Sequence, residues 1–156
     1  MFDEKLLRAE IIKEYDYPKT KEKVDEYFKK LETVIWYHAK INCHKGLGAR
    51  YDLSKVYQQI PYSSFRSDEF NLSAKEYSEE QLKRFISSYF CAKKGLNKEE
   101  QIFIEQHYVN FKYDEEIAPM LNIATVNGDS YALRRIKRSA VIKFAEFLEI
   151  AVLKTY

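Results

Sequence analysis

Residues that interrupt helices are scarce in this chain of 156 residues, which has only 4 glycines and 3 prolines. A sheet protein needs many turns rich in these residues, so their scarcity argues against that class. The 2 cysteines, Cys43 and Cys91, are too far apart for a metal-binding or redox motif. No apolar run reaches the roughly 20 residues of a membrane span, because Glu146 and Glu149 interrupt the longest one. These absences predict a soluble, all-helical protein with no membrane partner.

A large excess of charge is also missing, since the formal net charge is +2. A role in nucleic-acid binding would therefore depend on where the positive residues lie. Residues 1–13 are charged and contain no apolar core of a secretion signal, so we expect a cytoplasmic protein. The hydrophobic content of 46% is enough for a buried core, which excludes a disordered tail.

The first half of the chain predicts an N-terminal helical module over residues 1–77. A short amphipathic helix is expected before Asp16, and Thr20 is expected to cap a second helix. The apolar residues of the second helix recur at steps of three and four, at Val24, Tyr27, Phe28, Leu31, Val34 and Ile35. From Asn42 to Tyr77, glycine, proline and serine weaken the pattern, which predicts a loop-rich linker region with one helical turn.

The second half, residues 78–156, predicts a C-terminal helical region. Ser78 with Gln81 and Asn97 with Glu100 each match a capping box, in which the two side chains satisfy each other's backbone N–H groups. An apolar stripe typical of a packed helix follows the first box, at Leu82, Phe85, Ile86, Tyr89 and Phe90.

Three later segments predict a helix-turn-helix. Leu96–Tyr108 would form the scaffold helix and Asp114–Leu121 a short supporting helix. The last helix is expected to run from Ser130 to about Leu153, with Asp129 as its cap. In such a unit the supporting helix packs across a recognition helix that lies in the major groove. The predicted fold class is therefore all-α, a helical bundle with a C-terminal helix-turn-helix.

The last helix also carries a basic face. Leu133, Ile136 and Ala140 fall on one side of it, and residues 130–144 contain no acid. Phosphate contacts need positive side chains that nothing neutralises, and arginine can also pair with guanine in the groove. A solvated face is the simpler reading of an arbitrary basic helix, but the preceding Ile-Ala-x-x-Leu segment favours DNA contact. The predicted DNA-binding residues are Ser130, Tyr131, Arg134, Arg135, Lys137 and Arg138.

These segments resemble the ArpU family of phage and prophage regulators of Gram-positive bacteria. The stretch DEEIAPMLNI, followed by DSYALRRIKRSAVIKFAEFL, is similar to that family's helix-turn-helix, itself similar to the fourth conserved region of bacterial sigma factors. The stretch PKTKEKVDEYFKKLETV is similar to the family's opening helix. The resemblance places Asp129 at the capping position, Ser130 and Tyr131 in the groove-entering turn, and a basic signature at Arg135, Lys137 and Arg138.

What the resemblance implies is a DNA-binding transcription regulator in the bacterial host cytoplasm, an activator of phage late genes for packaging and lysis. Two features depart from the family pattern. Five residues, Ala124 to Gly128, lengthen the turn, and Pro119 removes a backbone donor from the supporting helix. These departures keep a second hypothesis open, a sigma-like interaction module that binds RNA polymerase or a phage packaging component without direct DNA binding.

Other chemistry has little support in the sequence. Zinc-ligand residue types occur, without the spacing of a metal site, at His38, Cys43, His44, Cys91 and His107. The acids of residues 114–116 favour the dipole of a helix start, and the chain has no glycine-rich phosphate loop or nucleophile elbow. We expect no enzymatic activity, no metal site and no cofactor. Because dimers often read DNA half-sites, a homodimer is the expected assembly. The N-terminal helices are expected to mediate self-association or contact with host RNA polymerase.

Overall fold

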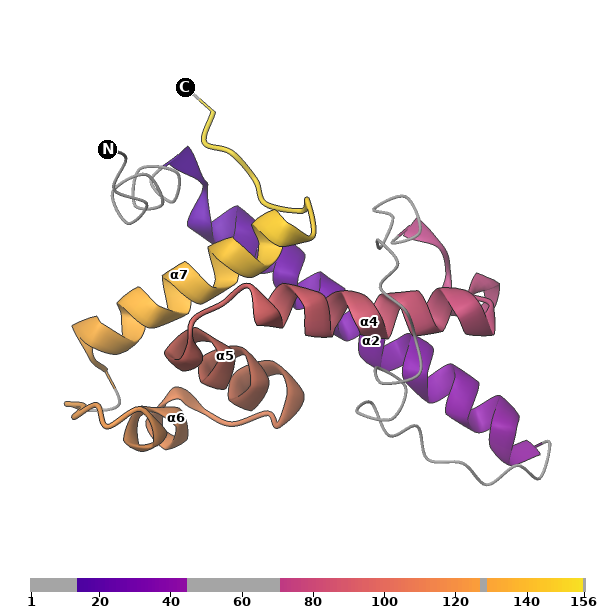
Figure 1. The fold of residues 1–156 in the computed structure, drawn as a ribbon, viewed down its shortest axis with the longest axis horizontal. Helices are drawn as coiled ribbons and strands as arrows, with labels where there is room; N and C mark the ends of the chain where they lie inside the picture. Colours follow the sequence, from indigo (N-terminus) through magenta and orange to yellow (C-terminus); the bar gives the residue numbers. More distant parts are fainter. Residues whose placement is uncertain (1–13, 45–70, 127–128, 156) are drawn as a thin grey trace. The chain divides into compact units, whose positions relative to one another are not determined.

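Helices form the regular structure of the protein, as the sequence predicts. The computed structural model describes residues 14–44, 71–126 and 129–155, and in these ranges extended backbone pairs only in isolated bridges. The all-α class is therefore confirmed (Figure 1). None of the helices in the described ranges combines the length and apolarity needed to cross a membrane.

The described residues form two compact units, and the long helix α2 (Tyr17–His44) contributes to both. One unit holds residues 14–24 and 93–155, and the other holds residues 25–44 and 71–92. This division lies within helices, whereas the boundary predicted between residues 77 and 78 follows a change in composition.

Two predicted segments lie outside the described residues, namely the opening amphipathic helix and positions 45–70 of the loop-rich region. The helix α2 continues to His44, so it extends past Asn42, where the loop was predicted to begin. Before the next long helix there is one short 3-10 turn, η2 (Ala74–Glu76).

The unit of residues 25–44 and 71–92 has an aromatic core between α2 and α4 (Glu79–Lys94). The capping box predicted before α4 is confirmed, since the Ser78 N–H donates to the Gln81 side chain at 2.9 Å and the Gln81 N–H donates to Ser78 Oγ at 3.1 Å. The Tyr27 ring stacks on the Phe85 ring with centroids 5.0 Å apart. The predicted apolar stripes of the two helices supply the buried residues Tyr27, Phe28, Leu31, Val34, Leu82, Phe85, Ile86 and Tyr89.

A chain of hydroxyl groups crosses this aromatic core. The fully buried Tyr27 hydroxyl bonds to the Ser88 hydroxyl, and Ser88 donates to the backbone carbonyl of Phe85. Burial raises the pKa of Tyr27 well above its ordinary value, because the phenolate would lose its hydration. The phenol therefore keeps its proton, and its role as a donor, above the pH at which a solvated tyrosine ionises.

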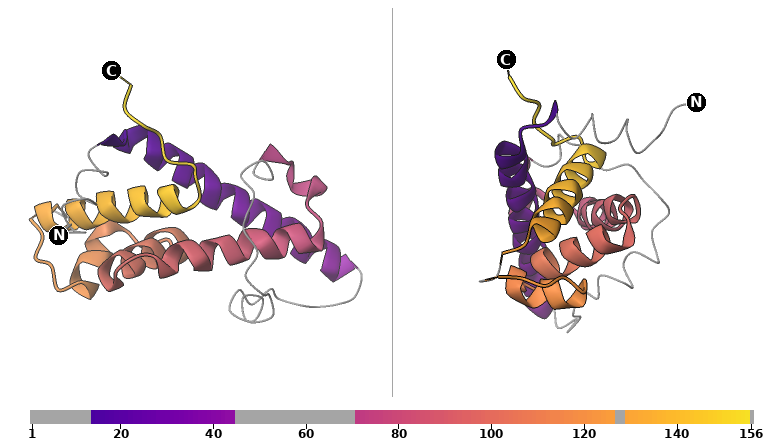
Figure 2. Two further views of the ribbon diagram at one scale, coloured as in Figure 1. Left: turned by 45° about the horizontal axis from the view of Figure 1, so that its top comes forward. Right: turned by 90° about the vertical axis from the view of Figure 1, so that its left-hand side faces the viewer.

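The other unit contains the segments predicted to form a helix-turn-helix (Figure 2). Helix α5 (Lys98–Ile104) begins at the predicted capping box of Asn97 and Glu100 and continues as a π-helical turn, η3 (Glu105–Val109). Helix α6 (Asp114–Met120) ends one residue before its predicted limit, and α7 (Tyr131–Phe147) packs along α5. The buried residues of these helices include Phe103, Ile104, Ile117, Ala118, Leu133, Ala140 and Phe144.

The prediction that the last helix extends to about Leu153 is wrong. Helix α7 ends at Phe147, and Glu149 adopts a positive φ of 60°. The Glu149 N–H donates to Glu146 O at 3.0 Å and the Ile150 N–H to Ala145 O at 2.9 Å, which is the pattern of a Schellman ending. Residues 150–155 form no further helix, and Leu153 forms a backbone bridge with Tyr15.

Thr20 is not a helix cap, which is a second correction. Helix α2 begins three residues earlier, where Asp16 Oδ1 accepts from the Lys19 N–H at 3.1 Å. Thr20 is fully buried, and its Oγ1 donates to Val152 O at 3.3 Å and accepts from the Val152 N–H at 3.0 Å. The Asp16 N–H also donates to Val152 O at 2.7 Å, and the Lys154 N–H to Glu14 O at 2.8 Å. We name these bonds between residues 14–20 and 152–154 the C-terminal clasp.

The raised pKa of Tyr27 predicts a specific loss of stability in alkali. The folded protein holds this proton more tightly than the unfolded chain, so its contribution is complete below about pH 10 and falls as the pH rises further, by at most about 1.4 kcal/mol per pH unit. At pH 8, Tyr27→Phe should lower the free energy of unfolding by about 1 kcal/mol through the lost hydrogen bond. Above pH 10 the difference should shrink and reverse, as measured by urea unfolding.

The matched control is Tyr113→Phe, because Tyr113 is 77% exposed. This variant should follow the parent protein over the whole pH series. If the stability difference between Tyr27→Phe and the parent stayed constant up to pH 11, the buried phenol would not be the cause of the alkaline loss.

Candidate nucleic-acid interface

The start of α7 differs in one respect from the prediction. Ser130, and not Asp129, is the cap residue, since its backbone is extended and its Oγ accepts from the Leu133 N–H at 3.5 Å. Asp129 instead contacts Arg134, with its Oδ1 3.2 Å from Nε. The predicted cap is therefore corrected by one residue, and Ser130 uses its side chain to begin the helix.

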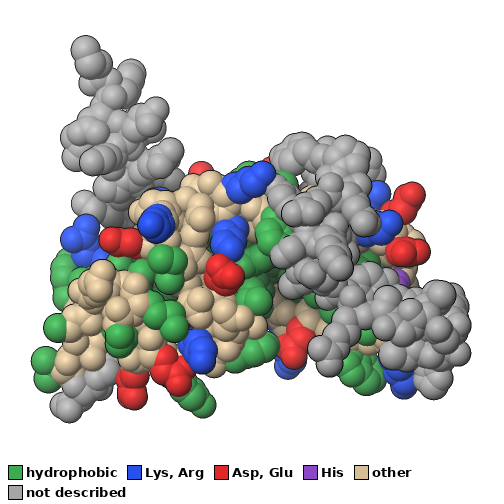
Figure 3. All heavy atoms as spheres, turned by 60° about the horizontal axis from the view of Figure 1, so that its bottom comes forward, with side chains coloured by type: hydrophobic (Ala, Val, Ile, Leu, Met, Phe, Trp, Pro, Cys, Tyr) green, Lys and Arg blue, Asp and Glu red, His purple; other side chains and the backbone are tan. Residues whose placement is uncertain are grey.

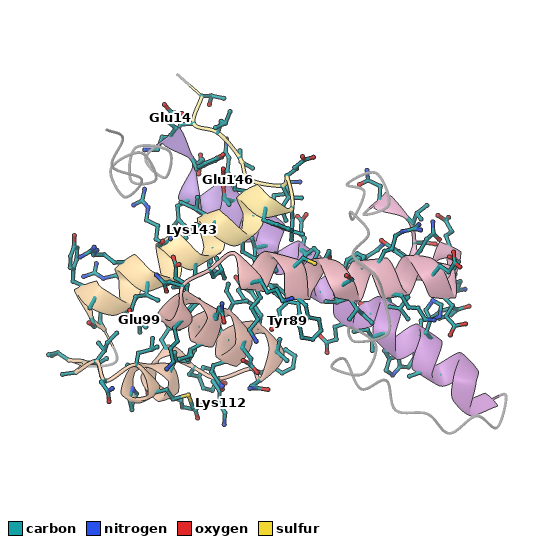
Figure 4. All side chains as sticks on the ribbon, in the orientation of Figure 1. Glu14, Tyr89, Glu99, Lys112, Lys143 and Glu146 are labelled. Carbon is teal, nitrogen blue, oxygen red and sulfur yellow. The ribbon has the colours of Figure 1, made fainter. Side chains whose placement is uncertain are left out.

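A buried carboxylate fixes which face of α7 points inward. Glu100 on α5 is 1% exposed, and its Oε1 accepts from the Asn97 N–H at 3.0 Å and from Lys143 Nζ at 3.1 Å. Its other oxygen accepts from the Ser139 hydroxyl and lies 3.0 Å from Lys143 Nζ. Figure 4 shows Lys143 on α7, and Glu99, the neighbour of Glu100, on α5. Because a buried charge must keep its partners, this cluster holds the Ser139 and Lys143 side of α7 against α5.

Lys137 also turns toward the protein. Its Nζ lies 3.4 Å from Asp114 Oδ2, and its side chain is 22% exposed. His107 Nδ1 lies 3.8 Å from the other oxygen of Asp114. Asp114 is the first residue of α6, so this contact joins the start of α6 to α7. Lys137 is thus engaged within the protein, although the sequence groups it with the basic residues of the recognition face.

The outward face of α7 carries an arginine stripe, which we define as Tyr131, Arg134, Arg135 and Arg138. Arg134 and Arg135 come three and four residues after Tyr131, and Arg138 comes four and three residues after them, so all four lie on one side of the helix. All four residues are exposed, and Tyr131 is 71% exposed. The Arg135 guanidinium lies over the Tyr131 ring, with Cζ 6.0 Å from its centroid. The stripe offers three positive charges on two turns of helix.

The excess of positive charge on the arginine stripe is local. On the face drawn in Figure 3, lysine and arginine side chains lie among aspartate and glutamate side chains, in keeping with the net charge of +2. Among the described residues, Asp129 neutralises part of the stripe, but both partners of the Asp129–Arg134 pair are about two-thirds exposed, with side-chain exposures of 66% and 65%. Exposed ion pairs contribute little and exchange readily, so Arg134 can leave Asp129 for a stronger anion.

The connection between α6 and α7 is closed by backbone hydrogen bonds. The Val126 N–H donates to Asp129 O and the Asp129 N–H to Val126 O, both at 3.0 Å. Pro119 lies in the last turn of α6, where the helix is about to end at Met120 and Asn122 takes a positive φ of 57°. Backbone pairing thus joins Val126 to Asp129, and Pro119 does not interrupt the middle of α6.

Of the six residues predicted to bind DNA, the structure brings four together on the arginine stripe. Ser130 caps the helix and Lys137 contacts Asp114. Sequence reasoning found Glu100 as a member of a capping box but missed its contact with Lys143, because no local pattern signals a partner 43 residues away. Among the residues that the structure describes, no group of His, Cys, Asp and Glu is placed to hold a metal ion.

The Glu100 cluster predicts a large loss of stability on truncation. Glu100→Ala should lower the free energy of unfolding by about 3 kcal/mol, because it removes the buried partner of Lys143 together with the helix-capping contact. Urea unfolding followed by circular dichroism measures this change. The control is the exposed neighbour, for which Glu99→Ala should change the same quantity by less than about 0.5 kcal/mol. Equal losses in the two variants would contradict a special role for Glu100.

Comparison with known proteins leaves the family open. The chain matches no protein-family model, no curated protein and no solved structure. The resemblance to the ArpU family therefore stays a hypothesis drawn from the residues themselves. The function has to be inferred from the geometry and charge of α7 and its neighbours.

Proposed function

We propose that this protein is a sequence-specific, double-stranded DNA-binding transcription regulator whose α7 enters the major groove. The observation that carries the proposal is the arginine stripe, three exposed arginines and an exposed tyrosine on one face of α7. The finer proposal, from the resemblance to the ArpU family, is an activator of phage late genes that acts in a bacterial cytoplasm, as a homodimer and beside RNA polymerase.

The different partners of the lysines and the arginines of α7 support this proposal. Lys143 pairs with the buried carboxylate of Glu100, and Lys137 pairs with Asp114, whose side chain is 35% exposed. Among the described residues, Arg134 pairs with the exposed Asp129, and Arg135 and Arg138 lie over aromatic rings, so the N–H groups of the stripe remain able to bind phosphate or a guanine edge. A helix built only to be solvated would need no such separation between inward lysines and outward arginines.

The geometry of α7 is also suitable for a groove. Its first two turns carry the stripe, and the N-terminal residues of a recognition helix are the ones that contact base edges. Tyr131 is the first residue of the helix and has a large exposed ring, while Arg134, Arg135 and Arg138 continue along the same face. Three phosphate contacts would give a slope of log affinity against log salt of about −2.7.

The central test removes two arginines of the stripe. Arg135→Ala combined with Arg138→Ala should weaken binding to a specific DNA fragment at least about thirtyfold and make the salt slope less steep by about 2, because two phosphate contacts are lost. Electrophoretic shifts on fragments of the gene's own neighbourhood, with competitor DNA and a salt series, measure both quantities.

The control variant removes the same charge elsewhere. Lys29→Ala combined with Lys75→Ala changes two exposed lysines that lie outside α7 and should leave affinity and slope within about twofold of the parent. Thermal unfolding of both double variants checks that the fold is intact. The DNA-binding proposal would be wrong if the parent protein showed no salt-sensitive shift, or if both double variants lost binding equally.

A different observation favours the second candidate function, an interaction module that binds RNA polymerase or a phage packaging component. Phe111, Tyr113 and Met120 are 67%, 77% and 47% exposed, and all three lie within ten residues around α6. Phe111 also holds a positive φ of 53°, which costs energy for a bulky residue. Exposed apolar side chains so close together in the chain are candidates for contact with another protein.

The two candidate functions predict opposite results for two double variants, one that changes Phe111 and Tyr113 and one that changes Arg135 and Arg138. If polymerase binding is the function, Phe111→Ser combined with Tyr113→Ser should weaken binding to purified bacterial RNA polymerase at least about tenfold, since exposed aromatic residues often dominate such contacts. The arginine double variant should then bind polymerase normally. The control is Trp36→Ser, which removes a 62% exposed aromatic side chain from the other unit. Sedimentation with the purified enzyme measures the binding, and an unchanged affinity of the aromatic double variant would exclude this surface.

A further inference from the structure

One arginine of the stripe is held by a residue outside α7. The Arg138 guanidinium lies over the ring of Tyr17, with its Cζ 5.7 Å from the ring centroid. This distance is within the range of a cation–π contact. Tyr17 is the first residue of α2, more than a hundred residues away in the chain, so the sequence pattern of the recognition helix contains no sign of it.

The C-terminal clasp keeps Tyr17 at this place. Asp16 and Thr20, on either side of Tyr17, are both bonded to Val152, and the Tyr15 backbone forms a bridge with Leu153. Thr20 is fully buried, so the first turn of α2 is fixed along its inner side. The ring of Tyr17 is therefore carried by a restrained backbone and not by a free chain end.

The arginine stripe ends at Arg138, the residue whose guanidinium lies over Tyr17. The next positions on the same side of α7, at steps of three and four residues after Arg138, are Val141, Ile142 and Ala145, and all three are fully buried. Arg138 is thus the last exposed side chain of the stripe, and a duplex lying along α7 would reach Tyr17 at that point.

We propose that Tyr17 is a positioning residue of the DNA interface, whose ring holds the Arg138 guanidinium in place for a backbone phosphate of double-stranded DNA. A guanidinium that lies over a ring can still direct N–H groups at a phosphate. Because Arg138 is already restrained, less side-chain entropy is lost on binding. The interface then spans two elements, α7 and the first turn of α2. This inference rests on the proposed DNA-binding function.

Two substitutions separate the ring from the rest of the side chain. Tyr17→Leu keeps an apolar side chain but removes the aromatic face, and it should weaken specific DNA binding about threefold, the loss expected for one exposed cation–π contact. Tyr17→Phe keeps the ring and should bind DNA like the parent protein. Fluorescence anisotropy of a labelled specific duplex measures the affinities, and thermal unfolding shows whether each variant is folded. If Tyr17→Phe loses as much affinity as Tyr17→Leu, the ring is not the reason and the inference is overturned.

A double-mutant cycle tests whether Tyr17 acts through Arg138. In the Arg138→Ala background, Tyr17→Leu should have no further effect on affinity, because there is no guanidinium left to hold. In the Arg135→Ala background it should still weaken binding about threefold. An equal loss in both backgrounds would mean that Tyr17 acts independently of Arg138, and the inference would fail.

The outcomes also separate this inference from the proposed function. If the parent protein binds no DNA at low salt, the proposed function fails and the role of Tyr17 fails with it. If the parent binds and the arginine double variant does not, but Tyr17→Leu binds like the parent, the function stands and only the positioning role is overturned. If the parent binds DNA, Tyr17→Leu binds it more weakly and Tyr17→Phe binds it like the parent, both the proposed function and the positioning role of Tyr17 are supported.

Discussion

The carboxylate of Glu100 is the contact on which the arrangement of this unit depends. It is buried between α5 and α7, and it accepts from the backbone of Asn97, from Ser139 and from Lys143. A charge in that position is stable only while its partners stay in place, so α7 cannot rotate about its axis without exposing an unsatisfied carboxylate to an apolar core. The Glu100 cluster fixes the rotation of α7 about its axis, and with that rotation Leu133, Ala140 and Phe144 are buried while Tyr131, Arg134, Arg135 and Arg138 are exposed. The exposure of the arginine stripe therefore depends on the packing of the whole helix, to which the buried acid on α5 contributes.

The same constraint divides the positive residues of α7 into two groups. The lysines at 137 and 143 act as internal counter-ions, one for Asp114 at the start of α6 and one for Glu100. The arginines lie on the outer face, where Arg135 and Arg138 lie over aromatic rings and Arg134 pairs with the exposed Asp129. This division fits the chemistry of the two side chains, since an ammonium group is a compact point charge and a guanidinium presents an edge of several donors while its face packs on a ring. One side of the basic helix α7 therefore packs within the protein, and the other is a candidate recognition surface.

The C-terminal clasp extends this organisation to the start of α2. Thr20 satisfies both polar groups of the Val152 backbone, and the neighbouring Asp16 and Glu14 bond to the same extended tail. These hydrogen bonds pair the backbone of the tail with the start of α2, although Val152 is only half-buried and residues 153–155 are exposed. Through this pairing the first turn of α2 is placed beside Arg138. The arrangement links the proposed DNA interface to residues that a reading of the helix-turn-helix segment alone would not include.

Local chemistry in the sequence was sufficient for the all-α class, for the capping boxes at Ser78 and Asn97, and for the apolar stripes of α2 and α4, because each depends on residues a few positions apart. It misplaced the end of α7, since a Schellman ending usually has glycine at the residue with positive φ and here that residue is Glu149. It misread Thr20 as a cap because a threonine before an apolar run favours that role, whereas the hydroxyl is taken by Val152. Composition and spacing thus determined which segments are helices and that α7 is basic. Only tertiary contacts decided which charges of α7 face inward and which residue of α2 lies beside Arg138. The partners lie tens of residues away in the chain, so local spacing cannot predict them.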